Sequence, residues 1–181
     1  MDRQPVLEGE RLLLRPLTHD DWESLLAVAC DPQLWAGHPA HDRWQEPVFR
    51  EFFADALAQG GALAIIDKAN SRIIGSSRFQ AYDPTGEGSV EIGWSFLERS
   101  YWGRGYNAEF KRLMLRHAFR HVDRVIFRVG AENAISRGAM TNIGGRLTGE
   151  TFFVERGGRP VEHVIFEITR ADFASGQLAS A

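Results

Sequence analysis

The sequence has one cysteine, no long apolar run and no excess of positive charge. Cys30 cannot form an internal disulfide, and its place in an apolar helical stretch predicts a buried structural thiol in a reducing compartment. No apolar run approaches the length that crosses a bilayer, and residues 1–5 contain no apolar signal region. We therefore expect a cytoplasmic protein that has no membrane partner.

The charge balance argues against nucleic acid as a partner. Lysine and arginine total 21 against 24 acidic residues, so the formal net charge is −3 and the chain has no general positive field. Any phosphate group must therefore be held by a local site. His38 and His41 lie close together in the sequence, but no third ligand lies near them, and we assign no metal.

Length and composition predict one domain over residues 1–181. Hydrophobic residues make up 44% of the chain and charged residues 25%, which is typical of a globular protein with a sizeable core. The residues after Phe173 are small and polar, and we expect this end of the chain to be frayed.

Hydrophobic periodicity, helix caps and turn residues divide the chain into helices and strands. Four helices are predicted, at residues 18–31, 46–59, 105–118 and 133–142, with an irregular loop at 34–44. Strands are predicted at 7–15, 62–67, 72–80, from 89 onward, and at 124–129, 147–154 and 161–168. The three strands from residue 62 form an antiparallel meander, and the strand at 124–129 returns parallel to the one that begins at Ser89. The fold class is therefore α+β with a mixed sheet.

The segment Trp102-Gly103-Arg104-Gly105-Tyr106-Asn107 joins a strand to a helix. Its two glycines lack Cβ atoms, so backbone N–H groups can turn toward one point at the helix N-terminus, where a phosphate is favoured. Arg104 adds a charge-assisted donor. Two glycines alone are better explained by a tight turn without a ligand, and the order of the surrounding elements is what favours phosphate binding.

That order of elements resembles the GNAT superfamily of acyl-CoA-dependent N-acyltransferases. Three segments are similar to its branch of ribosomal-protein N-terminal acetyltransferases, the Rim-type enzymes: residues 9–17, 101–106 and 133–137. The resemblance covers nearly the whole chain. It implies a GNAT-like fold with a central, mostly antiparallel sheet, a parallel pair splayed at the centre and about four flanking helices, and it implies acetyl-CoA as the co-substrate.

The resemblance also implies which residues bind the cofactor. The family's pyrophosphate loop falls on Trp102, Gly103, Arg104, Gly105, Tyr106 and Asn107, where Trp102 and Asn107 depart from the family pattern. Phe96 and Leu97 fall where family strands hydrogen-bond the pantetheine arm through the main chain. Asn133 and Ser136 match side chains that reach the cofactor from the next helix, and Asn133 also fits a simple helix cap.

The chemistry requires a neutral amine, a stabilised oxyanion and a leaving thiolate. The family's general-acid tyrosine is replaced by Met140, and Ser136 is the nearest hydroxyl that takes its place, unless it only serves the capping turn. Glu91 and Glu162 are the candidate bases acting through water, although each alone also fits an exposed carboxylate at a strand end. Backbone N–H groups at residues 94–96 are expected to meet the oxyanion.

The acceptor pocket is predicted in the irregular loop. Its candidates are Trp35, His38, His41 and Trp44, because aromatic residues in a loop either line a pocket or fill the core. The two roles remain alternatives at this point.

The sequence therefore predicts an N-acetyltransferase that moves an acetyl group from acetyl-CoA to a primary amine, either a protein N-terminus or a small molecule. We expect direct attack through a tetrahedral intermediate, in a monomer or a homodimer. A non-catalytic acyl-CoA sensor is the first alternative, because Met140 stands where a tyrosine is expected. A dinucleotide-binding protein is the second, because residues 103–108 also fit a Gly-x-Gly-x-x-Ala fingerprint.

Overall fold

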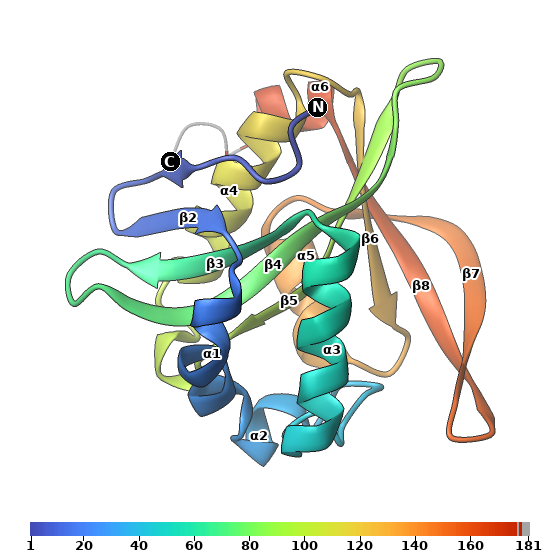
Figure 1. Cartoon of the computed structure of the whole chain (residues 1–181). Helices are drawn as coiled ribbons and strands as arrows, with labels where there is room; N and C mark the ends of the chain where they lie inside the picture. The colour runs from blue at the N-terminus through green and yellow to red at the C-terminus, as the bar shows by residue number, and fades with distance from the viewer. Residues whose placement is uncertain (177, 179–181) are drawn as a thin grey trace.

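The computed structural model describes residues 1–176 and residue 178, and shows one mixed sheet with helices on both faces (Figure 1). The order of the strands in the sheet is β1-β2-β3-β4-β5-β6-β8-β7. The strands are β1 (Leu7–Glu8), β2 (Leu12–Pro16), β3 (Ala62–Asp67), β4 (Arg72–Asp83), β5 (Ser89–Leu97), β6 (Arg124–Gly130), β7 (Arg146–Arg156) and β8 (Arg159–Thr169). All neighbouring strands are antiparallel except β5 and β6. The predicted fold class and the parallel pair are confirmed.

The described part of the chain contains more helices than the four that the sequence predicts. The α-helices are α1 (Trp22–Ala29), α2 (Pro32–Trp35), α3 (Glu46–Gln59), α4 (Tyr106–Ala118), α5 (Ala134–Asn142) and α6 (Arg170–Ser175), with short 3-10 helices at His19–Asp21 and Arg99–Tyr101. Helix α2 was not predicted, because Asp31 was interpreted only as the end of the preceding helix, whereas it also caps the start of α2. Its side chain accepts the N–H of Gln33 and caps a new helix that Pro32 begins.

Helix α6 lies partly in the segment that we expected to be frayed. Thr169 and Asp172 form a reciprocal capping box at its start, which is the local signal that the sequence reading overlooked. Residues 174 and 175 belong to this helix, and Leu178 packs against the hydrophobic core, so the expected fraying is wrong there; residues 177 and 179–181 lie outside the described part of the chain. None of the described helices is long and apolar enough to cross a membrane.

The expectation of a buried thiol is wrong. Cys30 is the C-cap of α1 and is exposed, because it follows the buried stripe of Leu25, Val28 and Ala29 at the point where the helix ends. Its Sγ donates a hydrogen bond to the carbonyl oxygen of Ala27, at 3.3 Å.

The sheet separates two hydrophobic clusters. Leu63 and Ile65 of β3 belong to the cluster that includes α4 and α5. Ala62 and Ala64 belong to the cluster that includes α1, α2 and α3. Successive residues of a strand point to opposite faces, so this alternation places the two groups of helices on opposite sides of the sheet.

The two parallel strands stay paired over a short distance only. Residues Ser89–Glu91 of β5 pair with Arg124–Ile126 of β6, and the remainder of the two strands carries no ladder between them. From this point β5 continues toward Leu97 along β4, while β6 continues toward Gly130 along β8. We call this opening between residues 92–97 and 127–130 the fork.

Candidate active site

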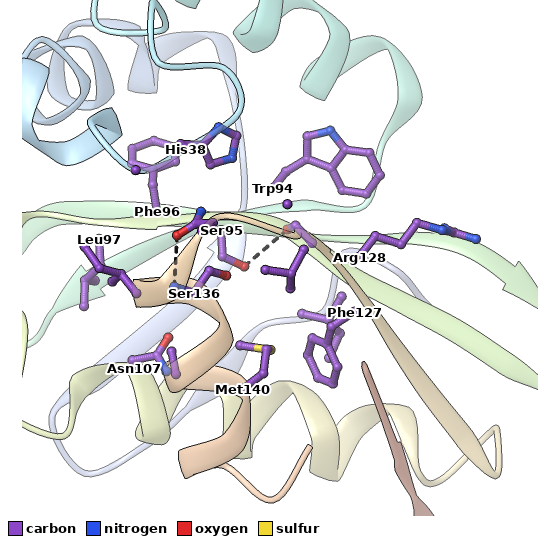
Figure 2. Close-up of a pocket in the computed structure, with 18 of the residues that line it drawn as sticks. His38, Trp94, Ser95, Phe96, Leu97, Asn107, Phe127, Arg128, Ser136 and Met140 are labelled. Atoms are coloured by element: carbon purple, nitrogen blue, oxygen red, sulfur yellow. Dashed lines mark hydrogen bonds between the residues drawn. The ribbon is translucent and has the colours of Figure 1, made fainter. Parts of the chain in front are cut away.

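A cavity of about 440 Å³ occupies the fork. Its walls come from β5, β6 and β8, from the turn before α4, from α4 and α5, and from α2 with the loop that follows it. Figure 2 shows residues of this cavity, with His38 and Trp94 on one side of the strands and Asn107 and Met140 on the other. Among the described residues, no aspartate or glutamate lines it. The cavity is thus an opening through the sheet with apolar walls and a few polar groups.

A β-bulge at Trp94 shapes the β5 wall. Ser76 of β4 pairs with Phe96, and Arg78 pairs with Gly93, so β5 carries one more residue than β4 over this stretch. Trp94 adopts a φ of 52°, which is rare for a residue with a side chain. The bulge shifts the alternation of side chains, so Ser95 points toward α4, where it meets Lys111, while Phe96 packs into the cluster with α1 to α3.

The glycine turn before α4 has the conformation that its sequence predicts. Gly103 and Gly105 have φ angles of 69° and 82°, in the region that disfavours side chains. No side chain caps α4. The N–H of Glu109 donates the first helical hydrogen bond, to the carbonyl of Gly105. The N–H groups of the first turn therefore remain available to an anion.

The residues of the predicted pyrophosphate loop do not all line the cavity. Trp102, Gly103 and Asn107 line it, whereas Arg104, Gly105 and Tyr106 do not. The ring of Tyr106 packs edge-on against Tyr101, with ring centroids 4.8 Å apart. The guanidinium of Arg104 is exposed and bends back to donate to the carbonyl of Ser100, at 3.2 Å. It is therefore available near the turn without entering the cavity.

Arg11 is a second arginine at this turn, and the sequence reading assigned it no role. Its Nη1 donates to the carbonyl of Arg104 at 3.0 Å, and its guanidinium lies 4.2 Å from the ring centroid of Tyr106. A Cβ on Gly105 would lie 3.3 Å from Nη2 of Arg11. Only contact between segments far apart in the chain brings this residue to the turn.

The two cofactor residues predicted on β5 line the cavity and are buried, each 6% exposed. The carbonyl of Leu97 is already engaged, because the indole Nε1 of Trp102 donates to it at 2.7 Å. This hydrogen bond thus connects the glycine turn to the end of β5, next to the part of the cavity wall that Phe96 forms.

Helix α5 contributes a hydroxyl and an apolar side chain. Asn133 is the N-cap, and its Oδ1 accepts the N–H of Ser136 at 3.1 Å. Asn133, Ser136 and Met140 all line the cavity, and Met140 is 5% exposed (Figure 2). The position of the family tyrosine is therefore an apolar wall.

The two candidate bases lie in different surroundings. Glu91 is 4% exposed, does not line the cavity and forms an ion pair with Arg128, which does line it. Burial raises the pKa of Glu91, although the nearby charge of Arg128 opposes the rise. Glu162 is exposed and lies outside the cavity, because its neighbour on β8, His163, is the residue whose side chain lines it.

The four predicted acceptor residues divide into two pairs. Trp35 and His38 line the cavity, whereas His41 and Trp44 are exposed outside it. Trp35 is also a core residue, since it is 2% exposed and its Nε1 donates to the carbonyl of Ala29 at 2.7 Å. Both roles considered from the sequence thus occur in one residue.

His38 is held as a neutral ring. Burial lowers its pKa to about 3, with Arg43, Arg156 and His163 adding repulsion. Its Nδ1 accepts the N–H of Ala40 at 2.9 Å, which leaves Nε2–H as a donor.

Lys111, Arg128 and His163 line the cavity and were missed by the sequence reading. Lys111 is 2% exposed, and burial lowers its pKa to about 7. The sequence offers one local sign that Lys111 is buried, namely its place within the apolar pattern of the helix after Gly105. Nothing in the sequence alone indicates that Arg128 and His163 face the same cavity.

The geometry fits a coenzyme A thioester. It combines main-chain donors at a helix start, two arginines beside that turn, and an apolar passage between two separating strands. Because β5 and β6 are the only parallel neighbours among the described strands, the sheet lacks the repeated parallel units of a dinucleotide-binding fold. The fold and site therefore define an acyl-CoA-dependent transferase.

The sequence profile of the acetyltransferase (GNAT) domain matches residues 11–146, and the chain belongs to this family. It is an acyltransferase that uses acetyl-CoA.

Solved structures share its fold. The GNAT-family acetyltransferase from Bacillus anthracis is 24% identical, with a TM-score of 0.75 over 91% of this chain and 98% of that one. RimJ from Mycobacterium smegmatis, solved in complex with CoA-disulfide, is 19% identical, with a TM-score of 0.72 over 93% of this chain and 86% of that one. The ribosomal-protein-S5-alanine acetyltransferase from Vibrio fischeri is 14% identical, with a TM-score of 0.69 over 93% of this chain and 98% of that one.

Proposed function

We propose that this enzyme acetylates an α-amino group, that of a peptide or protein N-terminus or of a small molecule that carries one. The observation that carries the proposal is the set of polar groups in the cavity lining. It includes Lys111, Arg128, His38 and His163, and no carboxylate among the described residues. Such a lining disfavours an amine that binds in its protonated, positively charged form.

The cost of neutralising the amine points the same way. At pH 7, a lysine-like amine with a pKa of 10.4 costs roughly 4.6 kcal/mol to deprotonate, whereas an α-amine with a pKa near 7.8 costs about 1 kcal/mol. A cavity without an ionised carboxylate on its surface provides little to offset the larger cost. The name of one structural neighbour, the ribosomal-protein-S5-alanine acetyltransferase, supports a protein acceptor.

We assign the binding of the co-substrate to one end of the fork. The free N–H groups at the start of α4 would hold the diphosphate, with Arg104 and Arg11 beside it. The main chain of Phe96 and the side chains of Asn133 and Ser136 would hold the pantetheine arm. The bound co-substrate supplies the activated acetyl group.

We assign the acceptor to the other end of the fork. The Nε2–H of His38 and the side chain of His163, which both line the cavity, would contact the acceptor, and Trp35 would form the inner wall. Glu91 would accept the proton of the attacking amine through water, with Arg128 between the carboxylate and the cavity. Backbone N–H groups around the bulge at Trp94 would meet the oxyanion.

The test is an amine panel with acetyl-CoA as the donor. It compares lysine-free peptides with a free N-terminus, peptides blocked at the N-terminus that carry an internal lysine, and small amines. We expect acetylation of the free N-termini, detected by mass spectrometry, with matching release of the thiol. Acetylation of the blocked lysine peptides alone would refute the assignment of an α-amine.

A further inference from the structure

The lysine of α4 lies where the two strands of the fork separate. Its Nζ donates a hydrogen bond of 2.7 Å to Oγ of Ser95 on β5. On the opposite side, Nζ lies 5.3 Å from the ring centroid of Phe127, the first residue of β6 beyond its last pair with β5. Lys111 is therefore held between the two strands, within the cavity that they line.

No opposite charge accompanies this buried amine. Among the described residues, no carboxylate forms an ion pair with Nζ, and Glu109 on the same helix is bound to Arg11. The other charged or titratable groups of the cavity are Arg128 on β6, His38 after α2 and His163 on β8, and none of them hydrogen-bonds Nζ. Burial alone lowers the pKa of Lys111 to about 7, so both protonation states are populated near neutral pH.

Few other groups of the cavity could donate a proton, and His38 is already a neutral ring. The leaving thiolate of coenzyme A requires a proton, and Met140 offers none. An arginine such as Arg128 is a poor proton donor in catalysis, because a guanidinium holds its proton too tightly. The hydroxyl of Ser136 is the other candidate, and it can pass on a proton only if it receives one from another group.

We propose that Lys111 donates the proton to the leaving sulfur of coenzyme A, an inference that rests on the proposed acetyl transfer. In this step the C–S bond of the thioester breaks and its electron pair goes to sulfur. One N–H bond of the ammonium group breaks, its proton joins that sulfur, and Nζ keeps the electron pair as a neutral amine.

The proton balance closes over one turnover. As the amide forms, the attacking amine nitrogen loses one proton, which passes through water and Glu91 to solvent, and Nζ regains one proton from solvent. The products are the acetylated amine and the free thiol, and the lysine is restored. Ser95, whose Oγ also lies 2.8 Å from Oγ of Ser77, positions the ammonium group throughout.

The first experiment measures the lysine directly in the unliganded protein. The sequence contains only two lysines, Lys68 and Lys111, so ¹³C labelling at lysine Cε gives two signals. Lys68 is partly exposed and paired with Glu8, and its signal is the internal reference. We expect the Lys111 signal to titrate near neutral pH and to shift when coenzyme A is added. A Lys111 signal that shows no titration near neutral pH overturns the proposal.

The second experiment varies the leaving group. Lys111→Met and Lys111→Arg are compared with the wild type, using acetyl-CoA and an acetyl aryl thioester whose thiolate leaves without protonation. With acetyl-CoA, kcat should fall roughly 10²- to 10⁴-fold in both variants, and the decline of activity at alkaline pH should disappear. With the aryl thioester, both variants should stay close to the wild type.

Three outcomes overturn the inference. They are equal losses with both donors, full activity of Lys111→Arg, and a Ser136→Ala variant that alone shows the donor-dependent loss. Thermal unfolding checks that Lys111→Met is folded, and if it is not, Lys111→Arg and the titration decide. A wild type that acetylates no amine refutes the proposed function and this inference together, whereas a donor-independent loss in an active enzyme refutes only the inference.

Discussion

The carboxylate of Glu109 accepts two hydrogen bonds from Arg11, one from its backbone N–H at 2.8 Å and one from its Nε at 2.7 Å. The backbone N–H of Leu12 adds a third, at 3.1 Å. Glu109 is 4% exposed in the first turn of α4, so these bonds join the N-terminal strand to the helix start that carries the glycine turn. This contact places Arg11 beside the predicted diphosphate site.

Glu109→Gln should destabilise the protein in a pH-dependent way. Burial alone raises the pKa of such a carboxyl, but the hydrogen bonds from Arg11 and Leu12 outweigh it and hold the pKa of Glu109 below its usual value. Its contribution is therefore present at neutral pH and is lost as the pH falls through the folded-state pKa. We expect the variant to lose about 1–3 kcal/mol of unfolding free energy at pH 7 and progressively less in acid, measured by urea titration.

The matched control for this change is Glu10→Gln, which removes an exposed carboxylate beside Arg11. It should alter the free energy of unfolding by less than about 0.5 kcal/mol. A loss for Glu109→Gln that does not depend on pH would contradict the role of its charge.

Gly105→Ala should weaken the binding of coenzyme A. The φ angle of 82° costs a residue with a Cβ about 1–2 kcal/mol, and Arg11 would also have to move. We expect the Kd for coenzyme A, measured by calorimetry, to rise about tenfold or more as the turn changes shape.

Gly138→Ala is the control for Gly105→Ala. Gly138 lies within α5, and an added Cβ would meet no atom within 4 Å. Alanine there should stabilise the protein by up to about 1 kcal/mol and leave the Kd unchanged. Equal affinities of the two variants for coenzyme A would argue against the turn as the diphosphate site.

Arg128→Gln should move the acid side of the pH–activity profile. Burial raises the pKa of Glu91 and Arg128 opposes that rise, so removing Arg128 raises the pKa further and keeps the carboxyl protonated to higher pH. If Glu91 is the base, the acid limb of kcat/KM shifts to higher pH. The control is Arg124→Gln. Arg124 lies on β6, as Arg128 does, but pairs with Glu167 of β8, so this variant should leave the acid limb in place. An unshifted limb in Arg128→Gln would exclude Glu91 as the base.

His38→Ala and His41→Ala should separate the acceptor site from its surroundings. His38 lines the cavity as a neutral donor, whereas His41 is exposed outside it. We expect His38→Ala to raise the acceptor KM without changing the Kd for coenzyme A, and His41→Ala to change neither. The comparison requires steady-state kinetics with one accepted peptide. Similar KM values for the two variants would show that the acceptor binds elsewhere.

Much of the fold is determined by local sequence, because periodicity and capping act between residues a few positions apart. The start of α4 after Gly105, the Asn133 cap of α5 and the meander of β3 to β5 follow from such patterns. The sequence reading failed where a local signal was overlooked, as at the Asp31 cap, or where burial could not be judged from one helix, as at Cys30.

The lining of the cavity was decided by tertiary structure, because it depends on contacts between distant segments. Arg11 reaches the turn through Glu109, almost a hundred positions away, and Lys111 becomes a buried amine only because β5 and β6 separate above it. The bulge at Trp94 decides which β5 side chains face α4. Sequence alone therefore determined the family and most of the element order, and only the packing of the sheet determined which polar groups share the site.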